Sequence, residues 1–396
     1  MEVKPEVETF AKIKVVGVGG SGGAAINRMI EAGLKGVEFI AVNTDAQALQ
    51  HSPAQKKIHI GKTTTRGLGA GMDPEVGYKA AEENQEELKE ALKGADMVFI
   101  TCGLGGGTGS GAGPFVAQCA KEAGALTVAV VTRPFAFEGA QRSHVADSAL
   151  SDLAESVDTI ITIPNDRLLQ IIDKKTSLLD AFGIVDEVLR QGVAGISDLI
   201  TVPGLINVDF ADVKSVMSEA GSALMGIGKA AGEHRAVEAA KAAIDSPLLE
   251  MSIEGAQGIL FTIMGGSNLG MFEVNEAARI ITENADPNAR IIFGAVIDES
   301  LKDEIQITVV ATGFGGKARS VKRREASNPF RDVDSLTPGT SRYSDDNETA
   351  AAPAGMSMMD DVTTAPPARS IMDEVKVDNS QDDDLDIPAF IRKKMM

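Results

Sequence analysis

The residues best suited to chemistry in this sequence are glycines gathered in three loops. The stretch GLGGGTGSGAGP, residues 103–114, follows an apolar run and precedes a helix-like run. Where a strand gives way to a helix, unpaired backbone N–H groups and the helix dipole attract an anion. The positions at which a missing Cβ lets the main chain approach a phosphate are Gly105, Gly106, Gly107, Gly109 and Gly111. Thr108 and Ser110 add hydroxyl donors, and no lysine follows as in a Walker loop.

An earlier loop, GVGGSGG, has the G-x-G-x-x-G spacing at Gly17, Gly19 and Gly22. Asp45 ends the next predicted strand, where a dinucleotide fold places its ribose-binding acid. A tight strand-to-helix turn without a ligand gives the same short pattern. Both interpretations stay open on this motif alone.

A third loop, GLGAGMDPEVG at 67–77, also lies on a strand-to-helix connection. Loops at the carboxyl ends of parallel strands converge on the crevice in which open α/β sheets bind ligands. A dehydrogenase needs only one such loop, so several loops favour a polyphosphate. We therefore expect a nucleoside triphosphate.

Polar residues farther along the chain can read a base. Asn165 in NDRLL offers an amide, and Asp186 and Glu187 offer carboxylates that accept from the N1–H and N2–H₂ groups of guanine. The alternative for Asn165 is a helix cap, a role that asparagine fills well.

Two acids stand three residues apart in NVDFADVKSVM, where Asp209 and Asp212 open a predicted helix. Both carboxylates face one side, so they can hold a cation and orient a hydrolytic water. The alternative is structural, with Asp209 as N-cap and Asp212 as a first-turn acid that complements the dipole. The predicted helix is also remote from the glycine loops.

The elements that must position these residues follow from periodicity. Short apolar runs alternate with helix-like segments in the first half, which predicts a parallel, doubly wound sheet. The predicted strands are 12–19, 37–44, 96–103, 126–132 and 157–164. A long helix is expected over 178–199, followed by helices over 208–228 and 233–244. Strand, helix, strand and strand are then expected in GILFTIMGG, MFEVNEAARIITENA, RIIFGAVID and EIQITVVATGF, which make a smaller α/β domain.

Composition limits the classes of function. The chain of 396 residues carries a formal charge of −19, which argues against a generic binder of nucleic acid or anionic membrane. Two cysteines without metal-type spacing indicate reduced, buried thiols. The N-terminus lacks an apolar signal region, and no apolar run is long enough to span a membrane, so we expect a cytoplasmic protein.

Beyond Gly316 the sequence becomes polar and rich in Ser, Asp, Pro and Ala, which predicts disorder. The last residues gather apolar side chains again, in DDDLDIPAFIRKK. Such a cluster at the end of a tether is typical of a binding peptide, although a solvated tail with chance apolar residues is the alternative. The peptide residues are Leu385, Asp386, Ile387, Pro388, Phe390 and Ile391.

The motifs together resemble the tubulin/FtsZ family, and within it the FtsZ proteins that polymerise at the bacterial division site. GGGTGSG matches the family signature, and VEFIAVNTDAQAL, RGLGAGMDPEVG, TRPFAFEG, ITIPND, LLDAFG, NVDFADVKSVMSEAG and LDIPAFIRKK stand in the family's order. The resemblance covers residues 12–315 and the last dozen residues. It implies a tubulin-like fold that binds GTP, with Mg²⁺ accompanying the nucleotide, and hydrolyses it between subunits.

The resemblance also implies roles for single residues. Asn207, Asp209 and Asp212 match the acidic loop that the family inserts into the nucleotide site of the next subunit, which removes the difficulty of their location. The expected nucleotide contacts are Gly19, Gly20, Ser21, Gly22, Asn43, Asp45, Ala70, Gly71, Gly105, Gly106, Gly107, Thr108, Gly109, Glu138, Arg142, Asn165 and Asp186. Two departures from the family are Ala24, where asparagine is frequent, and Cys102, which replaces a commoner alanine and raises the prospect of thiol modification beside the loop.

The expected organisation is a flexible segment (1–11), a GTP-binding domain (12–177), a connecting helix (178–202), an activation domain (203–316), a linker (317–381) and a partner-binding peptide (382–396). The expected partners are other copies of the chain in head-to-tail filaments, and membrane-tethering adaptors and assembly regulators at the peptide. Two other functions stay open: an NAD-type oxidoreductase, and a scaffold that does not hydrolyse nucleotide.

Overall fold

The structure, a computed structural model, describes residues 11–170, 176–202, 204–249 and 251–314. The predicted linker and partner-binding peptide lie outside these residues, as do residues 1–10 of the predicted N-terminal segment.

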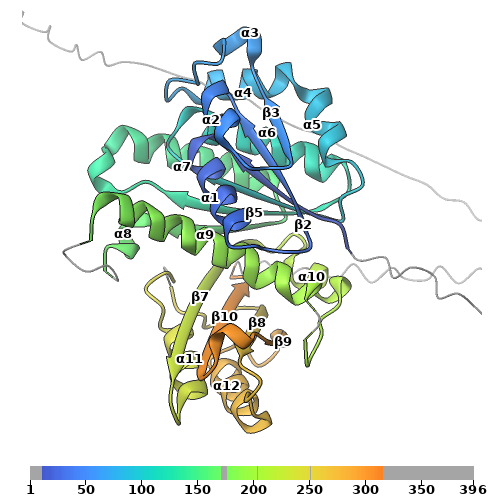
Figure 1. Ribbon diagram of the computed structural model, residues 1–396, viewed down its shortest axis with the longest axis vertical. Helices are drawn as coiled ribbons and strands as arrows, with labels where there is room; N and C mark the ends of the chain where they lie inside the picture. The colour runs from blue at the N-terminus through green and yellow to red at the C-terminus, as the bar shows by residue number, and fades with distance from the viewer. Residues whose placement is uncertain (1–10, 171–175, 203, 250, 315–396) are drawn as a thin grey trace, which may run out of the picture. The chain divides into compact units, whose positions relative to one another are not determined.

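The strands of the described residues form one ten-stranded sheet in the order β3-β2-β1-β4-β5-β6-β7-β10-β8-β9 (Figure 1). Their bounds are β1 (Ile13–Val18), β2 (Val37–Asn43), β3 (Lys56–His59), β4 (Met97–Gly103), β5 (Leu126–Arg133), β6 (Thr159–Pro164), β7 (Gly221–Ala231), β8 (Gly258–Gly265), β9 (Arg290–Ile297) and β10 (Glu304–Thr312). The sequence predicted all of these except β3 and β7.

The helices of the same residues are α1 (Gly19–Glu31), α2 (Ala46–His51), α3 (Lys62–Thr65), α4 (Pro74–Glu83), α5 (Gln85–Leu92), α6 (Gly107–Glu122), α7 (Ala140–Ser156), α8 (Asn165–Leu168), α9 (Leu178–Thr201), α10 (Phe210–Met217), α11 (Arg235–Ile244) and α12 (Met271–Glu283). Two 3₁₀ turns, η1 (Ala136–Glu138) and η2 (Glu299–Leu301), complete the list.

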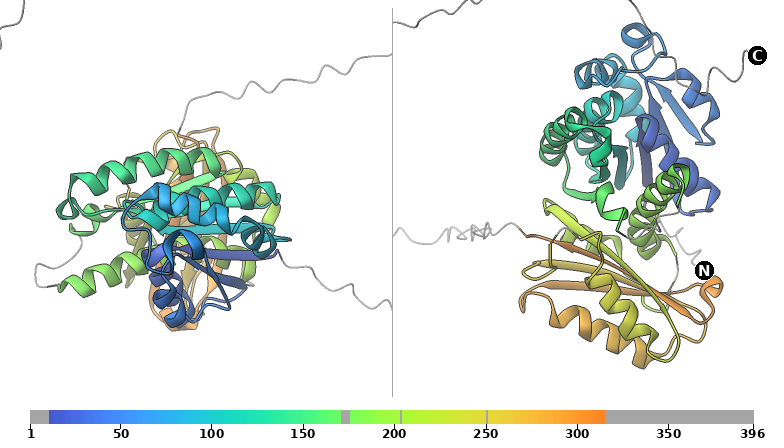
Figure 2. Two further views of the ribbon diagram at one scale, coloured as in Figure 1. Left: turned by 90° about the horizontal axis from the view of Figure 1, so that it is seen from above. Right: turned by 90° about the vertical axis from the view of Figure 1, so that its left-hand side faces the viewer.

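The first six strands are parallel and covered on both faces, which confirms the predicted doubly wound arrangement. One face packs against α1 and α9, where Ile26 and Leu189 share a buried cluster. The other face packs against α4 to α7, through residues such as Leu88 and Val116. The right-hand view of Figure 2 shows these helices on the two sides of the strands. Since the strands are buried on both faces, their sequences are apolar throughout.

The predicted long helix is α9, which begins after Ser177, whose hydroxyl accepts a hydrogen bond from Asp180 N at 3.1 Å. With 24 residues it is about 36 Å long. Figure 1 shows α9 crossing the molecule between the strands β1 to β6 and the strands β7 to β10.

The prediction of helix over 208–228 is wrong beyond Met217, because residues 221–231 form strand β7. This strand pairs along its length with β10 in antiparallel register. Its small residues let helix α11 lie directly on it: a Cβ at Gly226 or Gly228 would lie 2.0 Å from the carbonyl oxygen of Ala243 or Ala239. Tertiary packing therefore overrides the helical periodicity of this segment.

The last four strands make the sheet mixed. β10 runs antiparallel to both β7 and β8, whereas β8 and β9 are parallel. Helices α11 and α12 cover this part and contribute Ala239 and Ile281 to a third buried cluster. None of the helices in the described segments has the length and apolar character needed to cross a bilayer.

The contact between β7 and α11 gives a stability test. Gly228→Ala should lower the free energy of unfolding by more than about 2 kcal/mol, because the new methyl group meets backbone at 2.0 and 2.5 Å. Denaturant unfolding measures the change. Gly23→Ala is the control, because a Cβ at this helical position meets nothing within 4 Å. Equal stability of the two variants would contradict the packing described here.

Candidate functional site

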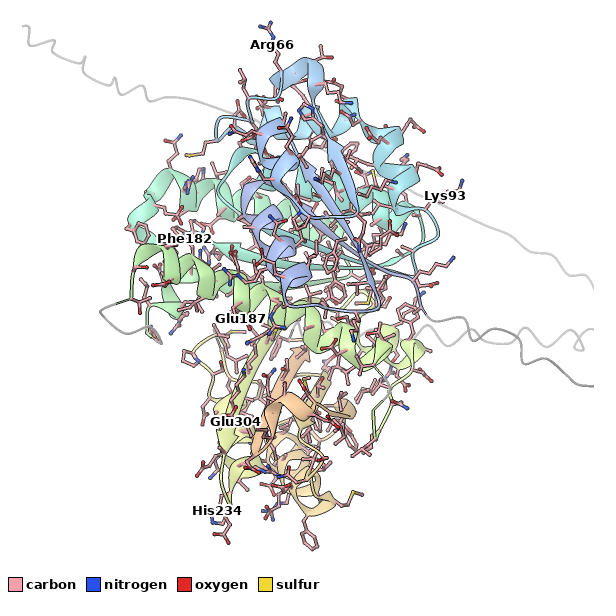
Figure 3. All side chains as sticks on the ribbon, in the orientation of Figure 1. Arg66, Lys93, Phe182, Glu187, His234 and Glu304 are labelled. Atoms are coloured by element: carbon pink, nitrogen blue, oxygen red, sulfur yellow. The ribbon has the colours of Figure 1, made fainter. Side chains whose placement is uncertain are left out.

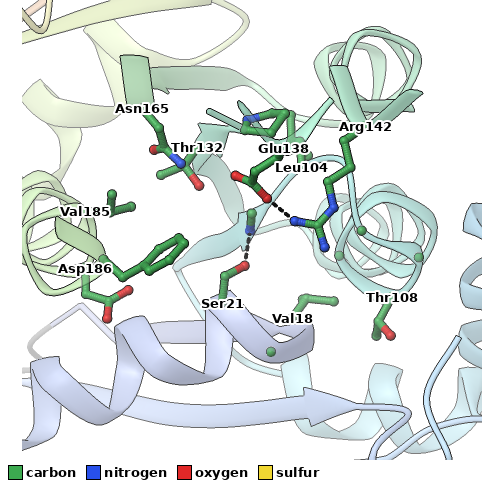
Figure 4. A pocket seen from close by; sticks show the side chains of 17 residues that line it. Val18, Ser21, Leu104, Thr108, Thr132, Glu138, Arg142, Asn165, Val185 and Asp186 are labelled. Atoms are coloured by element: carbon green, nitrogen blue, oxygen red, sulfur yellow. Dashed lines mark hydrogen bonds and ion pairs between the residues drawn. The ribbon is translucent and has the colours of Figure 1, made fainter. Parts of the chain in front are cut away.

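A cavity of about 330 Å³ opens at the carboxyl ends of β1, β4, β5 and β6 (Figure 4). This volume is within the range of small-molecule sites. The lining residues are Val18, Gly20, Ser21, Gly103, Leu104, Gly106, Gly107, Thr108, Gly109, Thr132, Pro134, Glu138, Arg142, Asn165, Phe182, Val185 and Asp186. The lining brings together loops that the sequence places far apart.

One end of the cavity is the N-terminus of α6. Gly106 is the N-cap residue and offers no side chain to the free N–H groups of the first turn. A Cβ at Gly106 would meet nothing within 4 Å, so open space lies in front of it. Free N–H groups and the positive end of the helix dipole make this end an anion site.

The hydroxyl groups of Ser21, Thr44 and Thr108 hold the loops at this end. Ser21 Oγ accepts a hydrogen bond from Gly103 N at 2.8 Å, which joins the first glycine loop to the second (Figure 4). The hydroxyls of Thr44 and Thr108 lie 2.7 Å apart. The Ser21 hydroxyl proton stays available to a ligand.

The three glycine loops meet, as the sequence predicts. A Cβ at Gly19 would lie 3.1 Å from Gly109 N, and one at Gly107 would lie 2.9 Å from the Cβ of Ala70. Part of the glycine content thus serves packing within the protein: a Cβ at Gly111 would lie 2.0 Å from Pro74 O. The expectation that Gly111 makes room for a phosphate is therefore wrong, because this glycine makes room for the backbone of α4.

Glu138 and Arg142 form an ion pair in the wall of the cavity (Figure 4). Glu138 also accepts a hydrogen bond from Phe135 N at 3.0 Å, so its carboxylate is held in place. The pair presents a cation and an anion side by side. Such a pair can bind hydroxyl and phosphate oxygens together.

Asn165 stands at the other end of the cavity, after β6. It does not cap the following helix, whose N-cap is Pro164, so the capping alternative is wrong. The residue is 5% exposed, and its Oδ1 is buried without a hydrogen-bond partner. An unpaired buried acceptor is costly, and an N–H or O–H group of a ligand would satisfy it.

Asp186 faces the cavity from α9. Burial raises the pKa of its carboxyl to about 6, and the charge of Arg28 acts in the opposite direction. Arg28 Nε lies 3.8 Å from Asp186 Oδ2. Above pH 6 the group is an anion poised to accept hydrogen bonds.

Phe182 was not predicted as a site residue, although it belongs to the quoted motif LLDAFG. It is 41% exposed and lines the cavity one turn before Asp186. Figure 3 shows Phe182 on α9. It packs edge-on against the buried Phe135, with ring centroids 5.7 Å apart. Its exposure on a largely apolar helix marks a stacking surface, and this exposure is a property of packing that no sequence pattern shows.

Several predicted contacts lie outside this lining. Gly19 and Asn43 line a neighbouring hollow of about 150 Å³, together with Ala24. The Asp45 carboxylate caps α2 by accepting from the amides of Gln47 and Ala48 at 2.9 and 3.2 Å. The dinucleotide interpretation of Asp45 therefore loses its support. Gly22 packs against Thr101, because a Cβ would lie 2.3 Å from Thr101 O.

The remaining predicted loop residues, Gly105, Ala70 and Gly71, are not among the residues that line the cavity. Gly105 has φ +93°, and a Cβ at this position would lie 2.9 Å from the carbonyl oxygen of Arg142. Ala70 is buried and Gly71 has φ +58° with open space around it. Cys102 is fully buried, and burial raises its pKa to about 12, so the expected thiol modification is disfavoured.

The predicted acids are placed elsewhere. Asp209 and Asp212 are exposed at the start of α10 and do not line the cavity of their own subunit. Asp209 is the N-cap, since its Oδ1 accepts from Asp212 N at 2.8 Å, and Asn207 Oδ1 accepts from Gly204 N at 2.7 Å. The structural alternative thus holds for Asp209. Within the described segments no hydrogen bond or ion pair engages the Asp212 carboxylate.

No cluster of three or more His, Cys, Asp or Glu side chains suited to a metal ion occurs in the described part of the chain.

The comparisons with known proteins agree with this geometry. Residues 12–173 match the model of the Tubulin/FtsZ family, GTPase domain, and residues 221–315 match that of the FtsZ family, C-terminal domain. A structure titled "FtsZ dimer, empty (M. jannaschii)" is 50% identical, with a TM-score of 0.75, covering 77% of this chain and 89% of that chain. A structure of a point mutant of M. jannaschii FtsZ has the same identity and TM-score, covering 77% of this chain and 92% of that chain.

A third structure, a GTPγS-bound protofilament of CetZ2 from Haloferax volcanii, has 24% identity and a TM-score of 0.65, covering 76% of this chain and 92% of that chain, and shares the fold. The identity to the M. jannaschii proteins and the two family matches show that this chain belongs to the tubulin/FtsZ family of GTPases, in its FtsZ branch.

Proposed function

We propose that the protein is an assembly-dependent GTPase that polymerises head to tail and forms the division-site ring in bacterial cytokinesis. The observation that carries this proposal is the separation of the two parts of the site. The cavity has an anion-binding end, whereas Asp212 is exposed outside it. The carboxylates that line the cavity are Glu138, which is paired with Arg142, and Asp186, which extends from α9.

In this proposal each part of GTP has its own residues. The triphosphate binds Gly20, Ser21 and the start of α6 from Gly106 to Gly109, while Ala70 and Gly71 close over the terminal phosphate. The ribose lies by Glu138 and Arg142. Phe182 stacks on the guanine, and Asn165 and Asp186 bond its edge. The Asn165 Oδ1 without a partner and the Asp186 carboxylate support this orientation.

Mg²⁺ would be held chiefly by phosphate oxygens and water, with the Thr108 hydroxyl as the side chain at hand. When bound, it would neutralise charge on the phosphates. The residues present fit such an ion, because Mg²⁺ in phosphate sites keeps several waters and needs few protein ligands.

Hydrolysis requires a group that orients and deprotonates water near the terminal phosphate. Asp212 is suited to this role, because its carboxylate has no partner in the described residues. Asp209 and Asn207 hold the backbone that presents it. A head-to-tail contact brings these residues to the cavity of the next subunit, and such a heterologous contact generates open filaments. The M. jannaschii dimer and the CetZ2 protofilament show that relatives assemble.

The terminal peptide would bind membrane-tethering adaptors and assembly regulators at mid-cell, through Leu385, Ile387, Pro388, Phe390 and Ile391 with Asp386. These residues lie outside the described part of the chain. This part of the proposal therefore depends on the sequence alone.

The pKa of Asp186 predicts the pH dependence of GTP binding. The affinity for GTP should fall as the pH drops through about 6, because a protonated carboxyl no longer accepts two hydrogen bonds from guanine. Asp186→Asn should bind GTP more weakly by about 1–3 kcal/mol at pH 7.5 and show a flatter pH profile. Titration calorimetry from pH 5 to 8 measures both effects.

The same shift has a consequence for stability. The pKa of Asp186 is about 6 in the folded protein and 3.8 in the unfolded chain, so folding takes up a proton between these pH values. The free energy of unfolding therefore falls as the pH rises from about 4 to about 6. Asp186→Asn should therefore be at least as stable as the wild type at pH 7.5. A loss of stability without a loss of GTP affinity would contradict the role of Asp186.

Nucleotide-dependent assembly tests the proposed function as a whole. Sedimentation and phosphate release are measured with GTP, GDP, ATP and NAD at one Mg²⁺ concentration. We expect polymer and phosphate release with GTP. Asp212→Ala should keep its GTP affinity while turnover per polymerised subunit falls about 10²-fold or more, because the group that orients water is lost.

Glu238→Gln is the matched control, because Glu238 is an exposed first-turn acid of α11. It should hydrolyse GTP at the wild-type rate. Wild-type turnover in polymers of Asp212→Ala, or no polymer with any nucleotide, would reject the proposal.

A further inference from the structure

The C-terminal end of α10 is held by side chains from three strands. A helix leaves its last four carbonyl groups without intrahelical partners. In α10, the first of these four carbonyl groups, Lys214 O, accepts a hydrogen bond from the backbone N–H of the C-cap residue Ser218 at 2.9 Å. The other three carbonyls accept from side chains: Ser215 O from Arg290 (3.3 Å), Val216 O from Thr312 (3.2 Å) and Met217 O from Thr159.

Two of these donors are buried. Thr159 begins β6 and is 0% exposed, and Thr312 ends β10 and is 1% exposed. The Thr312 hydroxyl also lies 3.3 Å from Gly258 O, and it donates to one of the two oxygens at a time. Water does not compete for these bonds, so they fix the end of the helix more firmly than surface bonds would.

The adjacent strand is shaped to receive the helix. A Cβ at Gly258 in β8 would lie 2.6 Å from Thr312 Oγ1 and 2.8 Å from the side chain of Val216. Only glycine leaves room for both groups at this point. The position of the C-terminal end of α10 therefore depends on contacts with several strands of the sheet and not on a single contact.

The turn that follows α10 is tied to the same place. Asp158 accepts from Thr127 N at 2.9 Å and from Glu219 N at 3.4 Å through its two carboxylate oxygens. Its carbonyl accepts from Gly221 N at 3.0 Å. The positive φ of Glu219, +50°, marks a tight turn between α10 and β7.

Strand β6 connects the C-terminal end of α10 with the cavity. Thr159 is its first residue, and Asn165 directly follows its last. The strand spans about 16 Å and pairs along its whole length with β5, so the nucleotide cavity and the C-terminal end of α10 lie at opposite ends of one short strand. The orientation of α10 is thereby fixed relative to the subunit's own nucleotide site.

We infer that Thr159 and Thr312, with Arg290 at the rim, are positioning residues for GTP hydrolysis, because they set the direction in which α10 presents Asp212 to the neighbouring subunit. This inference rests on the proposed function. None of the three side chains touches the nucleotide of its own subunit, since none lines the cavity.

The geometry makes the presentation of Asp212 sensitive to this end of the helix. Asp212 precedes Met217, the last residue of α10, by five residues or about 7.5 Å, so a tilt of about 8° about the C-terminal end moves the backbone of Asp212 by about 1 Å. Misplacement of a catalytic group by about 1 Å can lower a rate about 10²-fold. Loss of the C-terminal bonds should therefore affect catalysis more than binding.

The test uses Thr159→Val and Thr312→Val, singly and together, in the full chain. We expect the double variant to bind GTP within about twofold of the wild type, while turnover per polymerised subunit falls about tenfold or more. Thr159→Ser and Thr312→Ser keep the hydroxyl and should restore turnover. Thr262→Val is the matched control, because it removes a buried hydroxyl that donates to Gly195 O at 2.9 Å in the middle of α9.

Wild-type turnover in polymers of the double variant would overturn the inference, and so would an equal loss in Thr262→Val, which would assign the effect to general stability. The Ser variants keep the test decisive if the Val variants fold poorly: reduced turnover in the Ser variants would also overturn it. Asp212→Asn, measured in parallel, separates failure of the proposed function from failure of the positioning role. If Asp212→Asn retains turnover, the proposed function fails. If Asp212→Asn loses turnover and the threonine variants do not, only the positioning role fails.

Discussion

The structure depends on a close approach of backbones around the start of α6. A Cβ at Gly107 would lie 2.8 Å from Asp73 N, one at Gly77 would lie 2.3 Å from Gly107 O, and one at Gly109 would lie 2.8 Å from Gly103 O. Side chains at these positions would push the loops apart. Because the loops touch, free N–H groups of the α6 N-terminus line one end of the cavity.

The same arrangement leaves the cavity without a free acid at its anion-binding end. Glu138 is engaged by Arg142, and Asp186 lines the cavity from α9, on the side away from Thr108 (Figure 4). The sheet carries the missing acid on α10, which is seated on β6, β8, β9 and β10. In our proposal a second subunit completes the site, because this acid lies outside the cavity of its own subunit. The sheet holds α10 in a fixed position, which such a shared site requires.

The strands flanking the cavity could be predicted from sequence because they are buried on both faces and read as apolar runs. β3, with four residues, is too short to give a pattern, and β7 was predicted as a helix because its strand pairing and contact with α11 are not local properties. The convergence of the glycine loops was predictable because loops at the carboxyl ends of parallel strands meet at one edge of the sheet. The unpaired Oδ1 of Asn165 and the exposure of Phe182 depend on packing, and the capping role of Asp45 on loop geometry, so composition and spacing could not show them.

Mixing of two impaired variants tests the shared site most directly. Asp212→Asn keeps its nucleotide cavity and lacks the donated acid, whereas Asn165→Leu combined with Asp186→Ala keeps the acid and lacks recognition of the base. GTP turnover is measured for each variant and for an equal mixture, at a GTP concentration that the second variant does not bind. The account predicts that the mixture hydrolyses GTP well above the sum of the separate variants. Turnover equal to that sum would contradict it.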